Sequence, residues 1–228
     1  MISRAFGRGF SRAAGVLATA LIAGLLAAAA QASDDDLPLN ARFLVAARNA
    51  DGDAIARALQ QGAAINSRNR LGVTALIIVL KQDRVDLARV LIDAGADVNQ
   101  PAINGVTPLM AAAYGGHAEI ARMLVAKGAD ITAVDRLKKN AMTYAAGEGR
   151  TDVVTLLLDQ GVDPNAVYTN DLTALMWAAG YGKTETVKAL LAAGAKTQPR
   201  DNRGKTALDI ARDGNYDETA RVLTEAAP

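Results

Sequence analysis

The sequence predicts an all-α solenoid of about six helix-turn-helix units, each of roughly 33 residues. Glycines recur at one constant step at Gly62, Gly95, Gly128, Gly161 and Gly194. A second column keeps the same step with threonine or asparagine at Thr74, Thr107, Asn140, Thr173 and Thr206. A single globular core does not require a fixed period, whereas a stack of similar small units does.

The repeats divide residues 39–228 into six blocks. They run over 39–70, 71–103, 104–136, 137–169, 170–202 and 203–228. In each block we expect a turn, a short helix, a tight link and a longer helix, with a hairpin tip between successive units. One helix pair is too small to bury its own apolar face, so neighbouring units must form the core together.

The third block illustrates how each element is predicted. Thr107 and Pro108 supply a capping hydroxyl and a proline suited to the first helical position. The Gly115-Gly116 pair then breaks the chain before a second helix over 117–126, whose apolar residues recur at helical spacing. Gly128 ends that helix, where a left-handed residue is favoured.

The N-terminal segment differs in composition from the repeats. Three arginines precede an apolar, alanine-rich run over 13–30, and Ala30-Gln-Ala32 follows it. This order predicts a secretory signal peptide over 1–32, cleaved after Ala32, with an acidic linker over 33–38. The alternative is an uncleaved membrane anchor formed by residues 13–30, since the run is about long enough to cross a bilayer.

Charge and cysteine content exclude several classes of protein. The formal net charge is +1, and removal of residues 1–32 leaves −2. Such a balance argues against a nucleic-acid partner, which favours a strongly basic face. The chain has no cysteine, which excludes disulfides, thiolate catalysis and cysteine-ligated zinc.

Several phrases of the third block resemble the ankyrin-repeat consensus nearly residue for residue. They are Gly105-Val-Thr-Pro-Leu109, Ala112-Ala113, Gly116-His117-Ala-Glu-Ile120 and Gly128-Ala-Asp-Ile131. The resemblance covers about 39–228. With the export signal, the chain is similar to exported ankyrin-repeat proteins of bacteria. It implies a monomeric, periplasmic scaffold or adaptor that binds another protein, or alternatively an inhibitor of the immunity type against a toxin or enzyme.

The fourth block departs most from this pattern. Lys138-Lys139-Asn140-Ala141-Met142 replaces the glycine, threonine and proline of the opening phrase. We therefore expect residues 137–150 to be less protected from amide exchange than residues 104–117.

Candidate catalytic groups are better explained by structure. His117 is the only histidine, and its place matches the Gly-His that opens the second helix in the family. Asp97, Asp130 and Asp163 recur at the repeat step, as turn residues do. We therefore expect no enzyme activity, no metal or other cofactor and no small-molecule substrate.

Aromatic residues make up only 4% of the chain, so their positions are informative. Tyr114 and Tyr181 follow Ala-Ala pairs, at positions that face the concave groove in the family, and we expect them to bind the partner. Tyr144 and Trp177 precede such pairs and are either core or binding residues. Glu148 is expected between the two groove tyrosines.

The hairpin tips carry a series of cations. They are Arg68, Arg70, Arg136, Lys138, Lys139, Arg200, Arg203 and Lys205. They either maintain solubility or steer an acidic partner. Six residues complete the predicted contact set: Lys81, Arg70, Ile103, Arg136, Lys139 and Thr169.

Overall fold

The computed structural model describes residues 37–226. The predicted signal peptide and most of the predicted linker lie outside these residues. The repeats form a separate unit from Leu39 onward. Among the helices of residues 37–226, none is long and apolar enough to cross a bilayer.

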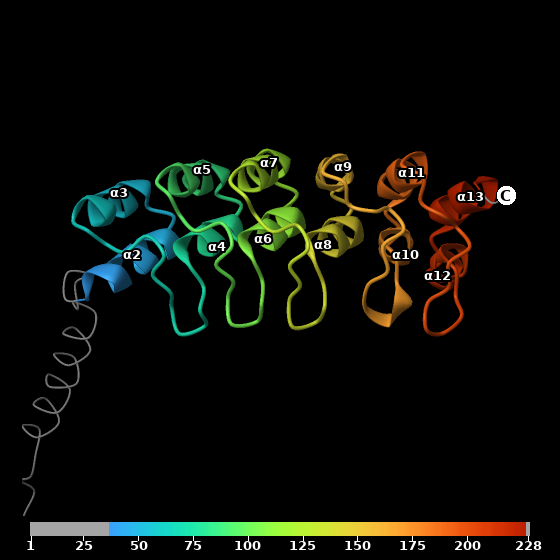
Figure 1. The fold of residues 1–228 in the computed structure, drawn as a ribbon, viewed down its shortest axis with the longest axis horizontal. Helices are drawn as coiled ribbons and strands as arrows, with labels where there is room; N and C mark the ends of the chain where they lie inside the picture. Colours follow the sequence, from blue (N-terminus) through green and yellow to red (C-terminus); the bar gives the residue numbers. More distant parts are fainter. Residues whose placement is uncertain (1–36, 227–228) are drawn as a thin grey trace, which may run out of the picture. The chain divides into compact units, whose positions relative to one another are not determined.

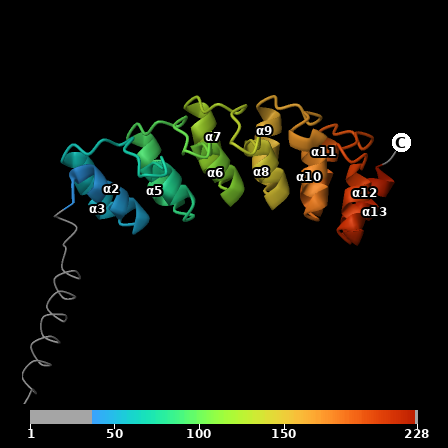
Figure 2. The same cartoon turned by 90° about the horizontal axis from the view of Figure 1, so that it is seen from below.

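The repeat unit contains six helix pairs in two layers (Figures 1 and 2). The inner layer holds α2 (Leu39–Arg48), α4 (Ala75–Leu80), α6 (Pro108–Gly115), α8 (Ala141–Glu148), α10 (Ala174–Gly180) and α12 (Ala207–Asp213). The outer layer holds α3 (Gly52–Gln60), α5 (Val85–Asp93), α7 (Ala118–Ala126), α9 (Thr151–Asp159), α11 (Thr184–Ala192) and α13 (Asp217–Glu225). Hairpins project from the inner layer, and one carries a 3-10 turn, η2 (Thr169–Asp171). The predicted all-α solenoid is confirmed.

Side-chain caps start five of the inner helices. The capping oxygens belong to the predicted column Thr74, Thr107, Asn140, Thr173 and Thr206. Each accepts a hydrogen bond from the backbone N–H three residues later, which satisfies a donor that the helix itself leaves free. The threonine column of the sequence is therefore a column of helix starts.

The fourth unit keeps its cap despite the altered sequence. The Asn140 side chain accepts from Thr143 N, and the Thr143 hydroxyl accepts from Asn140 N, which forms a complete capping box. Lys138 has φ of +59° where Gly105 has +85° one repeat earlier, so the left-handed turn forms here without its glycine. A side chain in this left-handed region costs roughly 1–2 kcal/mol.

The core lies between the two layers and runs continuously through the units. Alanines at the inner-helix centres, such as Ala112 and Ala145, are fully buried, and their small size lets neighbouring inner helices approach closely. Larger side chains from the outer helices, such as Ile120 and Leu157, fill the space above them. Because adjacent units share this core, each unit holds its neighbours in a defined orientation.

Asparagine side chains join successive units at the outer loops. Asn99 Nδ2 donates to Gly128 O at 2.8 Å, and its Oδ1 accepts from Asp130 N at 2.8 Å. Asn165 makes the equivalent pair of bonds to the next unit. At the position between them, Thr132 Oγ1 instead donates to Asp130 Oδ1 within its own unit. The junction of the third and fourth units therefore lacks this amide bridge.

Candidate functional site

Four aromatic side chains of the inner helices α6, α8 and α10 and of the residue that ends α10 form two contacting pairs, and we call them the aromatic row. Tyr114 and Tyr144 meet edge to face, with ring centroids 6.2 Å apart. Trp177 and Tyr181 stack nearly parallel, also with centroids 6.2 Å apart. Tyr114 and Tyr181 are more than half exposed, at 54% and 52%, whereas Tyr144 and Trp177 are half-buried. The row thus offers flat apolar area on a rigid base.

Lys139 joins the two aromatic pairs. Its Nζ lies 4.6 Å from the centroid of Trp177 and 5.7 Å from that of Tyr144. An ammonium in this position is attracted to both ring faces. Lys139 was predicted at a hairpin tip beside the groove, and its half-buried side chain turns back from the hairpin over the rings of the inner helices. The positive charge of Lys139 therefore lies within the aromatic row.

Asp135 organises this hairpin from inside. Its buried carboxylate accepts from Leu137 N at 2.8 Å, Lys139 N at 2.9 Å and the Tyr144 hydroxyl at 2.6 Å. Burial and the hydrogen bond to Asp135 raise the pKa of Tyr144 above its usual range, so the phenol stays protonated at neutral pH. Sequence reasoning missed Asp135, although Asn69 and Asp201 hold the equivalent turns two units before and after it.

A hollow of 480 Å³ adjoins the row on the side of the second unit. Lys81, Tyr114, Tyr144 and Arg150 contribute to its walls, and Arg150 Nε also donates to Tyr114 O at 3.0 Å. Asp83 lines the same hollow, and its Oδ1 lies 3.1 Å from Nε2 of the half-buried His117. The hollow therefore combines apolar walls with charges of both signs.

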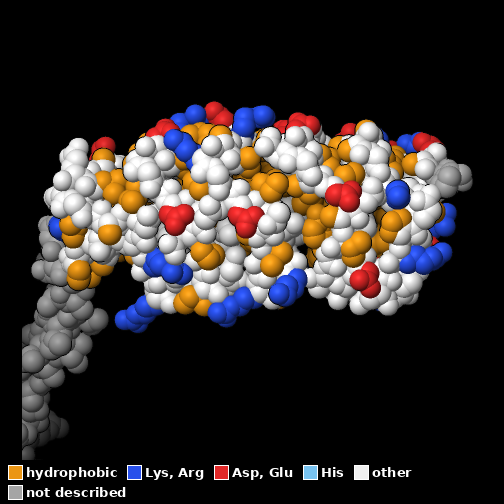
Figure 3. Space-filling model, in the orientation of Figure 1, with side chains coloured by type: hydrophobic (Ala, Val, Ile, Leu, Met, Phe, Trp, Pro, Cys, Tyr) orange, Lys and Arg blue, Asp and Glu red, His pale blue; other side chains and the backbone are white. Residues whose placement is uncertain are grey.

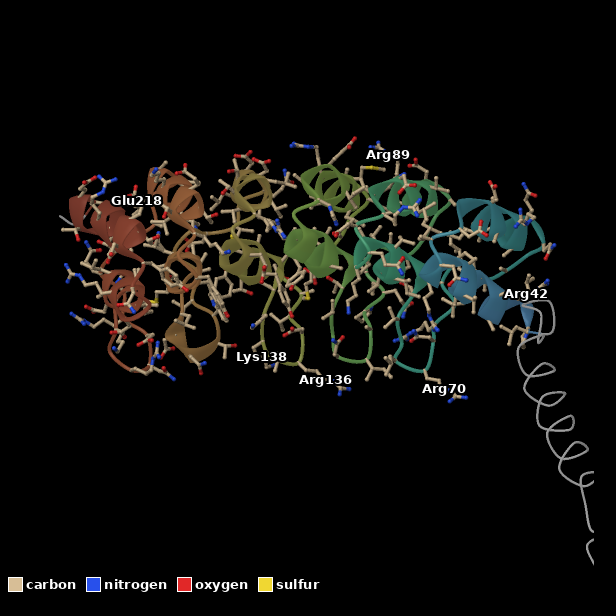
Figure 4. All side chains as sticks on the ribbon, turned by 180° about the vertical axis from the view of Figure 1, so that it is seen from behind. Arg42, Arg70, Arg89, Arg136, Lys138 and Glu218 are labelled. Carbon is tan, nitrogen blue, oxygen red and sulfur yellow. The ribbon has the colours of Figure 1, made fainter. Side chains whose placement is uncertain are left out.

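The hairpin cations fall into two groups. Arg68 donates to Gly72 O and Pro101 O, Arg203 pairs with the buried Asp201, and Lys205 pairs with Asp213. Those three cations therefore have structural partners within the repeat unit. Arg70, Arg136 and Lys138 instead extend from the free ends of the hairpins (Figure 4).

One family of known proteins matches nearly the whole repeat unit. The family described as ankyrin repeats in three copies matches residues 43–135, 103–168 and 142–227. The chain belongs to the ankyrin-repeat family. Ankyrin repeats are protein-binding scaffolds and are generally not catalytic. The comparison with curated proteins found no match.

The ankyrin scaffold brings some of the predicted contact residues together and leaves others apart. Tyr114, Tyr144, Trp177, Tyr181 and Lys139 form one cluster, and Lys81 reaches it through the hollow. The other predicted residues are not among these ring and cation contacts. Glu148 is half-buried at the end of α8, and Arg70, Ile103, Arg136 and Thr169 lie on successive hairpins. The cation between the two aromatic pairs is Lys139. The predicted placement of Glu148 between Tyr114 and Tyr181 stays a prediction.

The repeated carboxylates of this ankyrin chain have structural partners. Asp130 Oδ1 accepts from the hydroxyl and the backbone N–H of Thr132, and these bonds lower the pKa of Asp130. Asp97 and Asp163 accept from the backbone two residues later in the same way. Within residues 37–226, no group of three or more histidine, cysteine or acidic side chains could hold a metal ion.

Proposed function

We propose that this ankyrin-repeat protein binds its partner protein through the aromatic row, with Lys139 and the adjoining hollow as part of the same surface. The observation that carries the proposal is the exposure of Tyr114 and Tyr181 beside two half-buried rings. Tyrosine and tryptophan dominate binding energy at many interfaces because they contribute large area with little loss of entropy.

The row is already ordered before any partner arrives. Asp135 positions Tyr144, and the Lys139 ammonium bridges Tyr144 and Trp177. A preorganised surface loses little conformational entropy on association, and its backbone needs to move little. We therefore infer recognition by complementary shape and charge, with the partner placing side chains against the rings and into the 480 Å³ hollow.

We further propose that the protein acts in the periplasm after export. The support is the order of N-terminal arginines, an apolar run and Ala30-Gln-Ala32 in the sequence. The intact mass of the protein purified from its native cell tests this step. A mature chain starting at Ser33 is expected. A full-length chain in the membrane fraction would contradict the proposal and favour an anchor formed by residues 13–30.

Site-specific photocrosslinking tests the binding surface. A photoreactive amino acid is placed singly at Tyr114, Tyr181 or Val90, where Val90 is a matched position, 50% exposed on the outer helix α5. We expect the same partner adduct from Tyr114 and Tyr181 and none from Val90. Replacement of both tyrosines by alanine should then abolish copurification of that partner and leave the melting temperature within a few degrees of wild type, since both rings are exposed.

Two results would contradict this assignment. Adducts at Val90 alone would place the partner on the outer helices. A double tyrosine variant that folds and still binds the partner normally would show that the aromatic row is not the recognition surface.

A further inference from the structure

The first, second and third hairpins expose apolar side chains at their free ends. Leu71 and Leu137 are 68% and 65% exposed, more than any other large apolar side chain of the described residues. Ile103, on the hairpin between them, is 49% exposed. Exposed apolar side chains that are grouped at one edge of a protein often mark an interaction site, and these three lie on successive, hydrogen-bonded hairpins.

Cations accompany these apolar side chains along the same edge. Arg70 precedes Leu71, and Arg136 and Lys138 flank Leu137. Figure 4 shows the three cations extending from the hairpin ends, and Figure 3 shows arginine and lysine side chains gathered along that edge. None of the three forms a salt bridge in the described structure. We call Arg70, Leu71, Ile103, Arg136, Leu137 and Lys138 the hairpin edge.

Exposed acidic groups are missing from this part of the protein. Within the hairpin segments 66–73, 101–106 and 134–139, the one acidic residue is Asp135, whose carboxylate is buried and hydrogen-bonded to backbone N–H groups. The fourth hairpin differs, because its tip carries the exposed Asp171 in η2. The fourth hairpin also exposes the apolar Val167, but the stretch that is free of exposed acidic groups spans the first three hairpins and ends at the fourth.

Hydrogen bonds between hairpins hold the edge in place. Ile103 N donates to Leu71 O at 3.0 Å, and Arg136 N donates to Asn104 O at 2.9 Å. The next hairpin continues the series, with Thr169 Oγ1 donating to Lys138 O at 3.2 Å. The tips consequently form a row that is ordered before it meets a partner.

We propose that the hairpin edge binds the surface of a bilayer that contains anionic phospholipid. The three cations contact lipid phosphates, and Leu71, Ile103 and Leu137 enter the boundary between headgroups and acyl chains. The three cations project from the hairpin ends, whereas the hollow described above is lined by residues of the inner helices and their adjoining loops. A fluid bilayer moulds itself around projecting leucines, but a folded protein partner would need a matching groove. This inference is independent of the proposed protein-binding function.

Vesicle flotation tests the proposal. The full chain and the unit from Leu39 onward, which contains all the buried core residues, are each mixed with two kinds of vesicle. One kind is phosphatidylcholine alone, and the other is two parts phosphatidylcholine to one part phosphatidylglycerol. Wild type should float with the anionic vesicles only, and about 0.5 M NaCl should weaken this binding. The charge variant Arg70→Glu/Arg136→Glu/Lys138→Glu should lose at least on the order of 100-fold in partitioning, because removal of each cation is worth roughly fivefold and the new carboxylates also repel the phosphates.

Matched variants distinguish binding by the hairpin edge from effects of net charge or of exposed apolar side chains elsewhere on the protein. The control Arg57→Glu/Arg122→Glu/Lys127→Glu changes the net charge equally at exposed outer-helix positions, and it should bind nearly as wild type. Leu71→Ser/Leu137→Ser should weaken binding at least tenfold, whereas Val90→Ser should not.

Circular dichroism checks that every variant is folded. Equal losses in the edge variant and its control would overturn the proposal, as would absence of wild-type binding to anionic vesicles. Wild type that does not bind vesicles would also overturn the proposal if the edge variant gives a lower yield of the partner crosslink at Tyr114. The hairpin edge would then bind an acidic protein surface instead. Loss of the crosslink from the aromatic row would leave vesicle binding unchanged, so the two proposals fail independently.

Discussion

The hydroxyl of Tyr144 donates a hydrogen bond of 2.6 Å to Oδ2 of Asp135, a carboxylate that is buried within the hairpin leading into the fourth unit. This bond links the first helix of the fourth unit to the turn that precedes it. It also holds the Tyr144 ring against Tyr114, so the same contact supports both the fold and the aromatic row.

Replacement of Tyr144 by phenylalanine should lower the free energy of unfolding by about 1–3 kcal/mol, because the buried carboxylate loses a hydrogen-bond donor. Urea unfolding measures the difference. A suitable control is Tyr114→Phe, since the exposed Tyr114 shares the ring contact without bonding to Asp135. Equal stabilities for wild type and Tyr144→Phe would show that the bond contributes nothing net.

The Tyr144→Phe variant also tests how the free energy of unfolding depends on pH. Burial of the ring, and then its hydrogen bond to Asp135, raise the pKa of Tyr144 above the usual value of about 10. Above pH 10 the unfolded chain loses this proton while the folded chain retains it, so the free energy of unfolding falls as pH rises. Tyr144→Phe lacks this contribution. The stability gap between the two proteins should therefore narrow between pH 9 and pH 11, and a constant gap would contradict the assignment.

The missing amide bridge predicts a stabilising substitution. Asn165→Ala should cost about 1–3 kcal/mol, since it leaves Gly194 O and Lys196 N without their partner. Thr132→Asn should gain about 0.5–1.5 kcal/mol by joining the third unit to the fourth. Thr155→Asn, on the exposed face of α9, is the control and should change stability by less than about 0.5 kcal/mol. If Thr132→Asn is no more stable than Thr155→Asn, the predicted amide bridge between the third and fourth units is wrong.

Two glycines in equivalent turns should respond differently to alanine. Gly105 and Gly204 have φ of +85° and +78°, so either substitution strains the backbone by roughly 1–2 kcal/mol. At Gly105 the new Cβ would also lie 2.8 Å from Asp135 Cα, whereas at Gly204 nothing lies within 4 Å. Thermal unfolding should show a clearly larger loss for Gly105→Ala. Equal losses of stability in the two variants would indicate that the hairpin around Asp135 moves away from the new Cβ at no cost in free energy.

Lys139 and Lys138 form a natural pair for testing the cation over the rings. Lys139→Met removes the charge 4.6 Å from Trp177 but keeps an apolar side chain, and it should cost about 0.5–1 kcal/mol. Lys138→Met, at the exposed neighbouring position, should be nearly neutral. Unfolding followed by Trp177 fluorescence measures both, and the emission of the folded state should shift only in the Lys139 variant. Identical stability and emission of the two variants would show that Lys139 does not interact with the rings of the aromatic row.

The sequence by itself determined the period, the helix starts and the helix ends. These features depend on residues within a few positions of one another, such as the hydroxyl of Thr107 and the N–H of Met110. The left-handed turn at Gly128 is likewise a property of its own backbone. Local chemistry of this kind recurs in every unit, which makes the family resemblance and the unit boundaries recognisable without coordinates.

Only the tertiary structure decided which side chains meet across units. Tyr144 and Trp177 lie one full repeat apart in the sequence, and the position of Lys139 over both rings depends on how one hairpin folds back against two helices. The sequence placed Lys139 among the hairpin-tip cations beside the groove, without its ring contacts, and it left Asp135 unnoticed. Contacts between units depend on the packing of neighbouring side chains, and this packing has no signature in any single repeat.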